Sequence, residues 1–357
     1  MTDQQKTILI RKDIIEASKD LKLRYPFLKH QDLIGGLIFL FSVGSIILAS
    51  ILYLKVGISA WILIPWNAFW MSILHEMEHD LIHYMYFKKN AFIANFMLGV
   101  GWIARPLTVN PWFRRELHFH HHKYSGTIHD VEERGVTNGD QWNFKRLLST
   151  PDLLLGGILR TVKIKKDIIH SVKTGLISKE QALKFKKIST YGLLPFSLLM
   201  YLIWYVFLVH YAIIALQNVI GFEYTSPSWL TSQFHWINPL VMILIAPNIL
   251  RQFCLHFITS NLHYYGDVTS GNVMQQTQIF NVWWTFPMQL FCFFFGYTHA
   301  IHHFHVNETF YIRHFTRKKA WQVMKENGVR FNDLGTFRRT NRYQEKENNS
   351  EAVLSTN

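Results

Sequence analysis

Eleven of the nineteen histidines of this chain lie in three short clusters. They are His75, His79 and His83; His118, His120, His121 and His122; and His299, His302, His303 and His305. The clusters contain the patterns HxxxH, HxxHH and HxxHH, and each lies near a strongly apolar stretch. Neutral imidazole is a good ligand for iron, zinc and copper. The three clusters therefore predict one polynuclear metal site at the edge of a membrane.

Helical spacing indicates which imidazoles point together. At about 100° per residue, side chains three or four positions apart share one face of a helix. This spacing groups His75 with His79, His118 with His121 and His122, and His299 with His302 and His303.

Three further histidines of the clusters are expected to play supporting or interfacial roles. His120 and His305 point away from the partners in their own clusters. His83 continues the first stripe, but it lies about 12 Å along the helix axis from His75, too far for both to reach one metal easily.

The elements that must position these side chains are apolar helices. The chain has 357 residues, of which 49% are hydrophobic. Runs of about 20 apolar residues are long enough to cross a hydrocarbon core of roughly 30 Å. Four such segments predict four transmembrane helices: Ile34–Leu54, Val56–Leu74, Leu193–Asn218 and Trp236–Leu250, the last continuing to Ser260.

Two shorter apolar stretches must not cross if the clusters are to share metals. They are Ala91–Ala104, which is followed by Arg105 and Pro106, and Val282–Phe295. We expect both to be re-entrant or interfacial. The predicted fold is thus an all-α integral membrane protein with a cytoplasmic, histidine-rich di-metal cap.

The basic residues mark topology rather than nucleic-acid binding. The net charge is +13, yet no Lys or Arg occurs between Lys187 and Arg251. Because loops rich in Lys and Arg stay cytoplasmic, residues 220–234 are expected outside. We expect a cytoplasmic arm over residues 1–32, a membrane domain over 33–315 and a basic to polar tail over 316–357, disordered from about 339.

The clusters, in this order and at these membrane positions, resemble those of the integral-membrane fatty acid desaturases, a superfamily that also contains alkane and lipid hydroxylases. The resemblance covers about residues 30 to 315. It implies two irons ligated mainly by histidine, and the ligands it carries over are His75, His79, His118, His121, His122, His299, His302 and His303.

The resemblance also implies a ninth ligand after the fourth helix. The segment from Asn261 to Gly266 is similar to the histidine-tyrosine-glycine element of alkane hydroxylases, which favours His263. The acyl-CoA desaturases have an Asn four residues before this His, whereas Thr259 stands there in this chain. Asn261, acting through water, and His256 are the alternatives.

The implied chemistry is the oxidation of an unactivated methylene, with O2 as co-substrate and iron as the metal. Two roles are open for the nearby carboxylates: they accept imidazole N–H bonds and fix the ring tautomers, or they form a solvated surface of the cap. They are Glu76, Glu78, Asp80, Glu116, Asp130 and Asp267. No haem-binding or iron–sulfur motif appears in the sequence. An external ferredoxin, rubredoxin or cytochrome is therefore the expected electron donor.

Three functions remain open from the sequence. The first is desaturation of a lipid acyl chain, and the second is hydroxylation of an alkyl, fatty acyl or carotenoid-like chain on the same scaffold. The third is metal transport, although transporter ligands tend to lie near the bilayer midplane rather than at helix ends. The expected location is a bacterial inner membrane or the endoplasmic reticulum.

Overall fold

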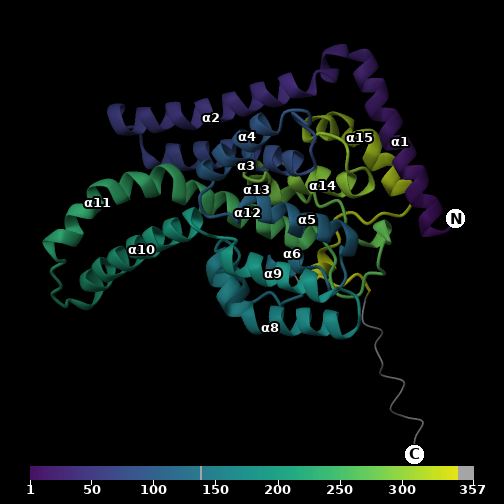
Figure 1. Ribbon diagram of the computed structural model, residues 1–357. Coiled ribbons are helices and arrows are strands. Elements are labelled where there is room, and N and C mark those ends of the chain that lie inside the picture. Colours follow the sequence, from purple (N-terminus) through teal and green to yellow (C-terminus); the bar gives the residue numbers. More distant parts are fainter. Residues whose placement is uncertain (137–138, 345–357) are drawn as a thin grey trace, which may run out of the picture.

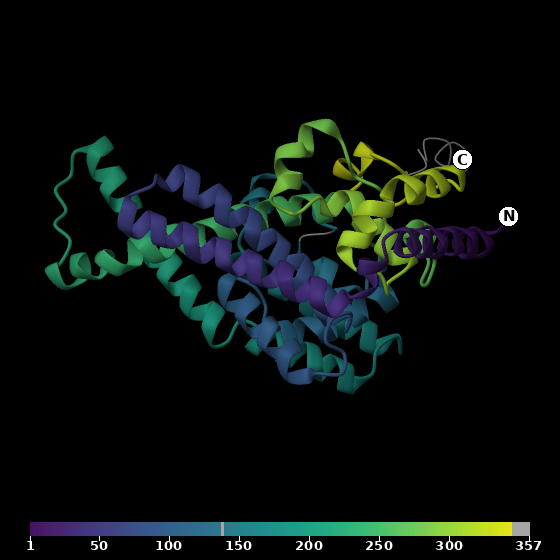
Figure 2. The ribbon, with the colours of Figure 1, turned by 90° about the horizontal axis from the view of Figure 1, so that it is seen from above.

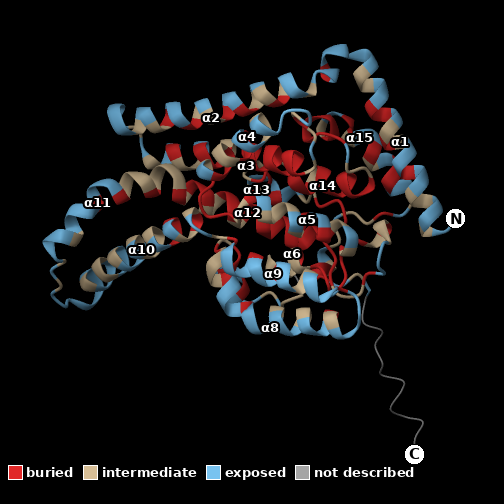
Figure 3. Cartoon of the chain, in the orientation of Figure 1, coloured by how far each residue is buried: buried red, intermediate tan, exposed pale blue. Residues whose placement is uncertain are grey.

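Three segments are long and apolar enough to cross a membrane among residues 1–136 and 139–344, which are those that the computed structural model describes. They are α2 (Gln31–Val56), α10 (Phe196–Ile220) and the segment Ser228–Leu262. The last joins α11 (Ser228–Leu240), the π-helical turn η2 (Val241–Ile245) and α12 (Ala246–Leu262). Only 22% of the membrane-length window of α2 and 17% of that of α10 are buried, as expected where lipid would surround a helix (Figure 3).

The second expected span forms helix α3 (Ala60–Ile82), which packs between α2 and α12. Its first part is apolar, but every residue from Met71 to Ile82 is buried, and this part includes Glu76, Glu78 and Asp80. Asn67 fixes α3 to the π-helical turn, since its Nδ2 donates to the Ile243 carbonyl at 2.9 Å. α3 is not among the three membrane-length segments, so a fourth crossing stays a proposal.

The remaining helices gather at one end of the long segments (Figures 1 and 2). They are α1 (Asp3–Arg24), α4 (Ala91–Ala104), α5 (Pro111–Tyr124), α6 (Val131–Gly135), α7 (Phe144–Ser149), α8 (Leu153–Lys173), α9 (Lys179–Tyr191), α13 (Phe286–Leu290), α14 (Phe295–Phe304) and α15 (Phe310–Glu326). Short 3₁₀ turns lie between them or, for the last, after α15: η1 (Pro26–Lys29), η3 (Val273–Gln275), η4 (Trp283–Thr285) and η5 (Leu334–Phe337). In the described residues, β-pairing is limited to two isolated bridges, so the all-helical class is confirmed.

Neither short apolar stretch forms a membrane-length helix. α4 has 14 residues, about 21 Å of helix. The stretch Val282–Phe295 is divided into η4 and α13 and then breaks at Phe293 and Phe294, where φ is 46° and 53°. The three histidine clusters consequently lie at the same end of the long helices.

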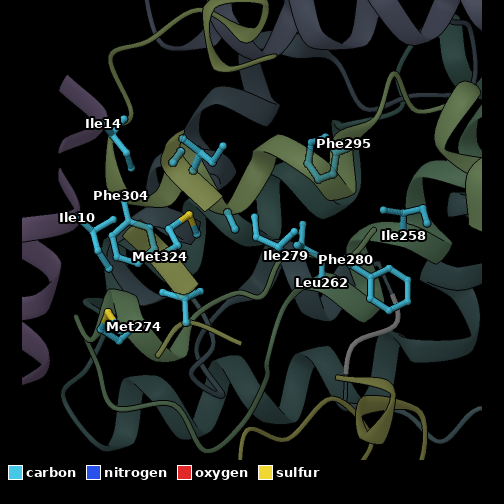
Figure 4. Close-up of a cluster of buried hydrophobic side chains, with 14 of the residues drawn as sticks. Ile10, Ile14, Ile258, Leu262, Met274, Ile279, Phe280, Phe295, Phe304 and Met324 are labelled. Carbon is cyan, nitrogen blue, oxygen red and sulfur yellow. The ribbon is translucent and has the colours of Figure 1, made fainter. Parts of the chain in front are cut away.

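The N-terminal arm packs onto the body instead of standing free. α1 lies along α15 (Figure 1), and Ile10 and Ile14 enter a core that includes Phe304 and Met324 (Figure 4). Arg11 Nε donates to the Phe304 carbonyl at 2.9 Å. The arm therefore supports α14, the helix that carries the third histidine cluster.

α8 and α9 form an amphipathic pair over α5. Ile177, Phe185 and Ile188 bury their side chains against Phe113 and Leu117 of α5. The lysines of the two helices remain on the outer surface.

The C-terminal region differs from the expected boundaries. The division at 315/316 falls inside α15, and residues 339–344 are placed against the body. Asn341 is fully buried and donates to the Ser260 carbonyl, while the backbone N–H groups of Tyr343 and Gln344 donate to Asp267 at 2.8 and 2.9 Å. These bonds keep this stretch on the body, and the expected disorder beyond it concerns residues 345–357, outside the described part.

Candidate metal centre

Nine histidines form two adjacent groups whose ligand atoms could each surround one metal ion. The first group is His79, His83, His118, His122 and His302. The second group is His121, His263, His299 and His303. Within each group, the ligand atoms all lie within 4.8 Å of one another. We call these the five-histidine group and the four-histidine group.

Four elements bring the imidazoles together. The C-terminal end of α3 carries His79 and His83, and α5 and α14 each contribute three of the others. His263 is the C-cap of α12. On α5, His121 and His122 point to different groups although they are neighbours in sequence, because successive helical residues are about 100° apart. The second and third clusters thus contribute to both groups.

The distances between ring nitrogens match those of ligands that share an ion. The Nε2 atom of His122 lies 3.2 Å from that of His83, 3.1 Å from that of His118 and 3.0 Å from that of His302. In the four-histidine group, Nε2 of His303 lies 3.2 Å from that of His299 and 3.3 Å from that of His263. Nitrogens bound at about 2.1 Å to one ion are roughly 3.0 to 3.4 Å apart.

Four of the rings have a hydrogen-bond acceptor at Nδ1, which leaves Nε2 of each ring available to bind a metal. Nδ1 of His118 donates to Glu132 at 2.9 Å, and Nδ1 of His121 donates to Asp130 at 2.8 Å. Nδ1 of His303 donates to Gln276 Oε1 at 3.0 Å. Nδ1 of His263 lies 3.0 Å from the Thr259 carbonyl and 3.4 Å from Glu133. With the proton on Nδ1, the Nε2 lone pair faces the group.

His79 gives an independent sign that a cation fits this site. Both of its ring nitrogens are buried and lack a hydrogen-bond partner among the described residues. Leaving buried polar atoms unpaired is costly, and a bound metal would remove that cost. An all-imidazole donor set suits iron as well as zinc or copper.

Burial and charge set the protonation of the site. Burial lowers the pKa of His118, His122, His299 and His303 well below 6.5, so that these rings are neutral and ready to ligate. His121 differs. Burial alone would lower its pKa too, but the Asp130 carboxylate outweighs burial and raises the pKa to about 10. Without metal, His121 is therefore charged at neutral pH, and a metal must displace its proton.

The first cluster is arranged differently from the sequence-based expectation. His75 belongs to neither group; its Nδ1 lies 3.5 Å from Nη1 of Arg105 and 3.4 Å from Nη1 of Arg114. His83, which was expected to stand aside, lies in the five-histidine group. The argument that His75 and His83 are too far apart to share a metal still applies. The pair that faces α5 and α14 is His79 with His83.

The other histidines considered from the sequence lie outside both groups. Nε2 of His120 donates to the His129 carbonyl at 2.9 Å, and its ring packs on Phe185. His256 directs Nδ1 to the Thr150 carbonyl at 2.8 Å. His305 is also in neither group. Asn261 donates to the Phe257 carbonyl, while its Oδ1 atom is buried without a partner among the described residues.

The carboxylates expected near the ligands divide into three kinds. Asp130 contacts a grouped histidine directly. Glu76 and Asp80 bind Arg313, whose Nη1 donates to Nδ1 of His302 at 2.8 Å; Glu78 binds Arg105 and Arg114. Glu116 is exposed, and Asp267 holds the C-terminal segment.

Sequence reasoning missed Glu132, Glu133 and Arg313. The two glutamates follow Asp130 after a single residue, Val131, so this acidic segment after the second cluster was their available signal. Arg313 has no such signal. It is fully buried and joins α15 to α3 through Glu76 and Asp80.

Residues 56–335 match the fatty acid desaturase family. Because the match covers well over half of the chain, the chain belongs to this family, which is a family of di-iron oxidoreductases. No curated protein and no solved structure matches the chain.

Proposed function

We propose that this protein is an O2-dependent membrane enzyme that desaturates a lipid acyl chain at a di-iron centre held by nine histidines. The observation that carries the proposal is the pair of adjacent, mostly buried imidazole groups in a chain of the fatty acid desaturase family. One iron would be held by the five-histidine group and the other by the four-histidine group. Bound iron would supply the reductive activation of O2 that oxidation of an unactivated methylene requires.

Residues around the rings would keep the centre ready for metal. Glu132, Asp130 and Gln276 accept Nδ1–H bonds and so hold three rings with Nε2 turned inward. Arg313 ties the α15 segment to α3 and to His302. All four rings of the four-histidine group are buried, and in the five-histidine group only His83 and His122 are half-buried. This limits the access of bulk water and so protects a reactive centre from side reactions.

The electron donor would be a small external protein of the ferredoxin, rubredoxin or cytochrome type. Exposed lysines of α8 and α9, among them Lys163, Lys166 and Lys186, lie on the same pair of helices that covers α5. A positive surface would steer an acidic partner to this side. The proposed orientation puts this side in the cytoplasm, because the outer loop carries no Lys or Arg.

Hydroxylation on the same scaffold is the second candidate. It is favoured by the segment from His263 to Gly266, which is similar to the element of alkane hydroxylases, and by the position of His263 in the four-histidine group. Metal transport receives no support from a chain that belongs to a family of oxidoreductases.

Lipid profiling separates these candidates. Acyl lipids of a host that carries the gene would be compared by mass spectrometry with those of a host that carries the His302→Ala variant. Desaturation removes two hydrogens from a chain, whereas hydroxylation adds one oxygen. New double bonds that depend on His302 support the proposal, new hydroxyl groups support the second candidate, and an unchanged profile across acyl lipids and alkanes contradicts both.

A further inference from the structure

An open apolar groove lies between α2 and α3, away from the metal centre. Its volume is about 940 Å³, and none of the nine grouped histidines lines it. The α2 wall extends from Leu37 to Leu48, about 16 Å of helix, and the α3 wall carries Trp66 and Trp70. Phe310 and Tyr311, at the start of α15, line it together with these walls.

The position of the groove identifies its neighbour. α2 is one of the three membrane-length segments, and Leu37, Leu40, Phe41 and Leu48 on it are exposed. In a membrane, such side chains contact the hydrocarbon tails of lipids rather than water. An apolar groove about 16 Å long on that surface has the chemistry to hold lipid acyl chains.

Two unpaired hydrogen-bond donors on residues that line the groove favour a specific lipid site over general contact with the bilayer. The Trp70 Nε1 atom and the Tyr311 hydroxyl, on two residues that line the groove, are both buried and lack a hydrogen-bond partner among the described residues. Tyr311 is 7% exposed. The Thr309 hydroxyl beside it is also unpaired, and even a bond between these two hydroxyls would leave one donor unused.

Donors that are shielded from water need an acceptor from the ligand. Leaving a polar group unsatisfied in such surroundings is energetically unfavourable. Lipid ester carbonyls are acceptors without a donor, and they lie where the acyl chains meet the headgroups. Tyr311 belongs to α15, which is not one of the membrane-length segments. Its hydroxyl is therefore expected at the depth of the ester carbonyls, where the hydrocarbon core ends.

We propose that the groove is a binding site for one ester-linked acyl lipid of the bilayer, separate from the metal centre. The acyl chain lies between α2 and α3, and Tyr311 and Trp70 donate to polar atoms of the lipid. The site holds a lipid whether or not the enzyme proves to be a desaturase.

Photolabelling tests the site in the full-length protein. The probe is a phosphatidylcholine with a diazirine in one acyl chain, incorporated at known mole fraction into nanodiscs that hold the protein. After irradiation, labelled peptides are located by mass spectrometry. We expect labels on residues 37–48 of α2 and on Trp66 and Trp70, reaching saturation as the probe fraction rises.

Two matched variants separate this site from ordinary lipid contact. Ser45 lines the groove, so Ser45→Phe should fill it and lower labelling there by about tenfold. Ile47 is an exposed neighbour on the same helix that does not line the groove, so Ile47→Phe should leave labelling unchanged. Equal labelling in wild type and Ser45→Phe would overturn the proposal. So would an absence of labelling on residues 37–48 in wild type, the result expected if a second copy of the chain covers the groove.

Tyr311→Phe tests the polar contact without changing the shape of the groove. Loss of one hydrogen bond should raise the half-saturating probe fraction by about two- to tenfold. The same increase should be absent when the probe carries ether-linked chains, which lack the carbonyl. An identical response to ester and ether probes would overturn the assigned role of Tyr311. Unchanged circular dichroism in all variants shows that they are folded.

Discussion

Nδ1 of His118 lies 2.9 Å from Oε2 of Glu132. This bond joins α5 to the short helix α6 and fixes a ring of the five-histidine group with its Nε2 atom inward. Glu132 is also 3.6 Å from Arg114, which in turn binds Glu78 of α3. The Glu132 carboxylate thus connects His118, a proposed ligand, with the ion pair between Arg114 and Glu78.

Glu132→Ala should weaken metal binding by about 10- to 100-fold, because partners that orient ligating histidines typically contribute this much. Glu132→Gln keeps an acceptor oxygen and should retain most of the affinity. Competition with a graded chelator, followed by metal analysis, measures the change. Glu116→Ala, at an exposed position of α5, the helix that carries His118, is the control. Equal metal affinity in Glu132→Ala and Glu116→Ala would contradict the orienting role.

Metal loading of the four-histidine group should depend on pH through His121. Since the Asp130 carboxylate raises the pKa of this ring to about 10, the ring holds a proton at pH 7 that the metal must displace. Apparent affinity should therefore rise as the pH increases from 7 towards 10. Calorimetry in buffers of different ionisation enthalpy counts the released protons.

The control for this prediction is Asp130→Asn. It removes the charge that keeps His121 protonated. Its single amide oxygen can still accept from the Glu133 backbone N–H, whereas the bond from the Gly126 backbone N–H to the second carboxylate oxygen is lost. The variant should release about one proton fewer than wild type at pH 7. Equal proton release would show that His121 is neutral before metal binds.

His83→Ala should lose iron, whereas His75→Ala should retain it. The structure places His83 in the five-histidine group and His75 beside Arg105 and Arg114. The measurement is the number of iron ions per chain in each purified variant. Wild type should hold two, one for each histidine group. His120→Ala provides a second control, because this ring bonds to the His129 carbonyl. Loss of iron from His75→Ala with retention in His83→Ala would restore the assignment made from the sequence.

The choice between His75 and His83 shows what could and could not be predicted from the sequence. The segment from His75 to His83 contains two overlapping HxxxH pairs, and helical geometry treats them as equivalent. Which pair meets the other clusters depends on how far α3 extends past α5 and α14. That is a tertiary relationship, so local spacing cannot supply it. The second and third clusters had no such ambiguity, since in each of them only one face of the helix carries three histidines at helical spacing.

The long apolar helices could also be predicted from the sequence, because the hydropathy of a segment depends on that segment alone. The placement of the C-terminal segment could not be predicted. Residues from 339 onward are polar, yet Asn341 is buried through bonds to Ser260 and Arg146, both distant in sequence. A composition that predicts disorder cannot report a partner of this kind. Arg313 was missed for the same reason, because its carboxylate partners lie on α3.

The last prediction concerns the proposed topology. With α2, α3, α10 and the α11–α12 segment crossing, the loop before Ser228 lies on the side opposite to the histidines. Cysteines would be introduced singly at Ser228, Lys123 and Asn307, all of which are exposed. An impermeant thiol reagent applied from outside should label Ser228→Cys, and should label Lys123→Cys and Asn307→Cys only after permeabilisation. The native Cys254 and Cys292 are buried, so the background should be low.

Labelling of all three positions from outside would reverse the assigned face, because the two histidine-side positions would then be extracellular. Outside labelling of Lys123 with protection of Asn307 would be more serious, since α5 and α14 would lie on opposite sides of the membrane and could not share a metal centre.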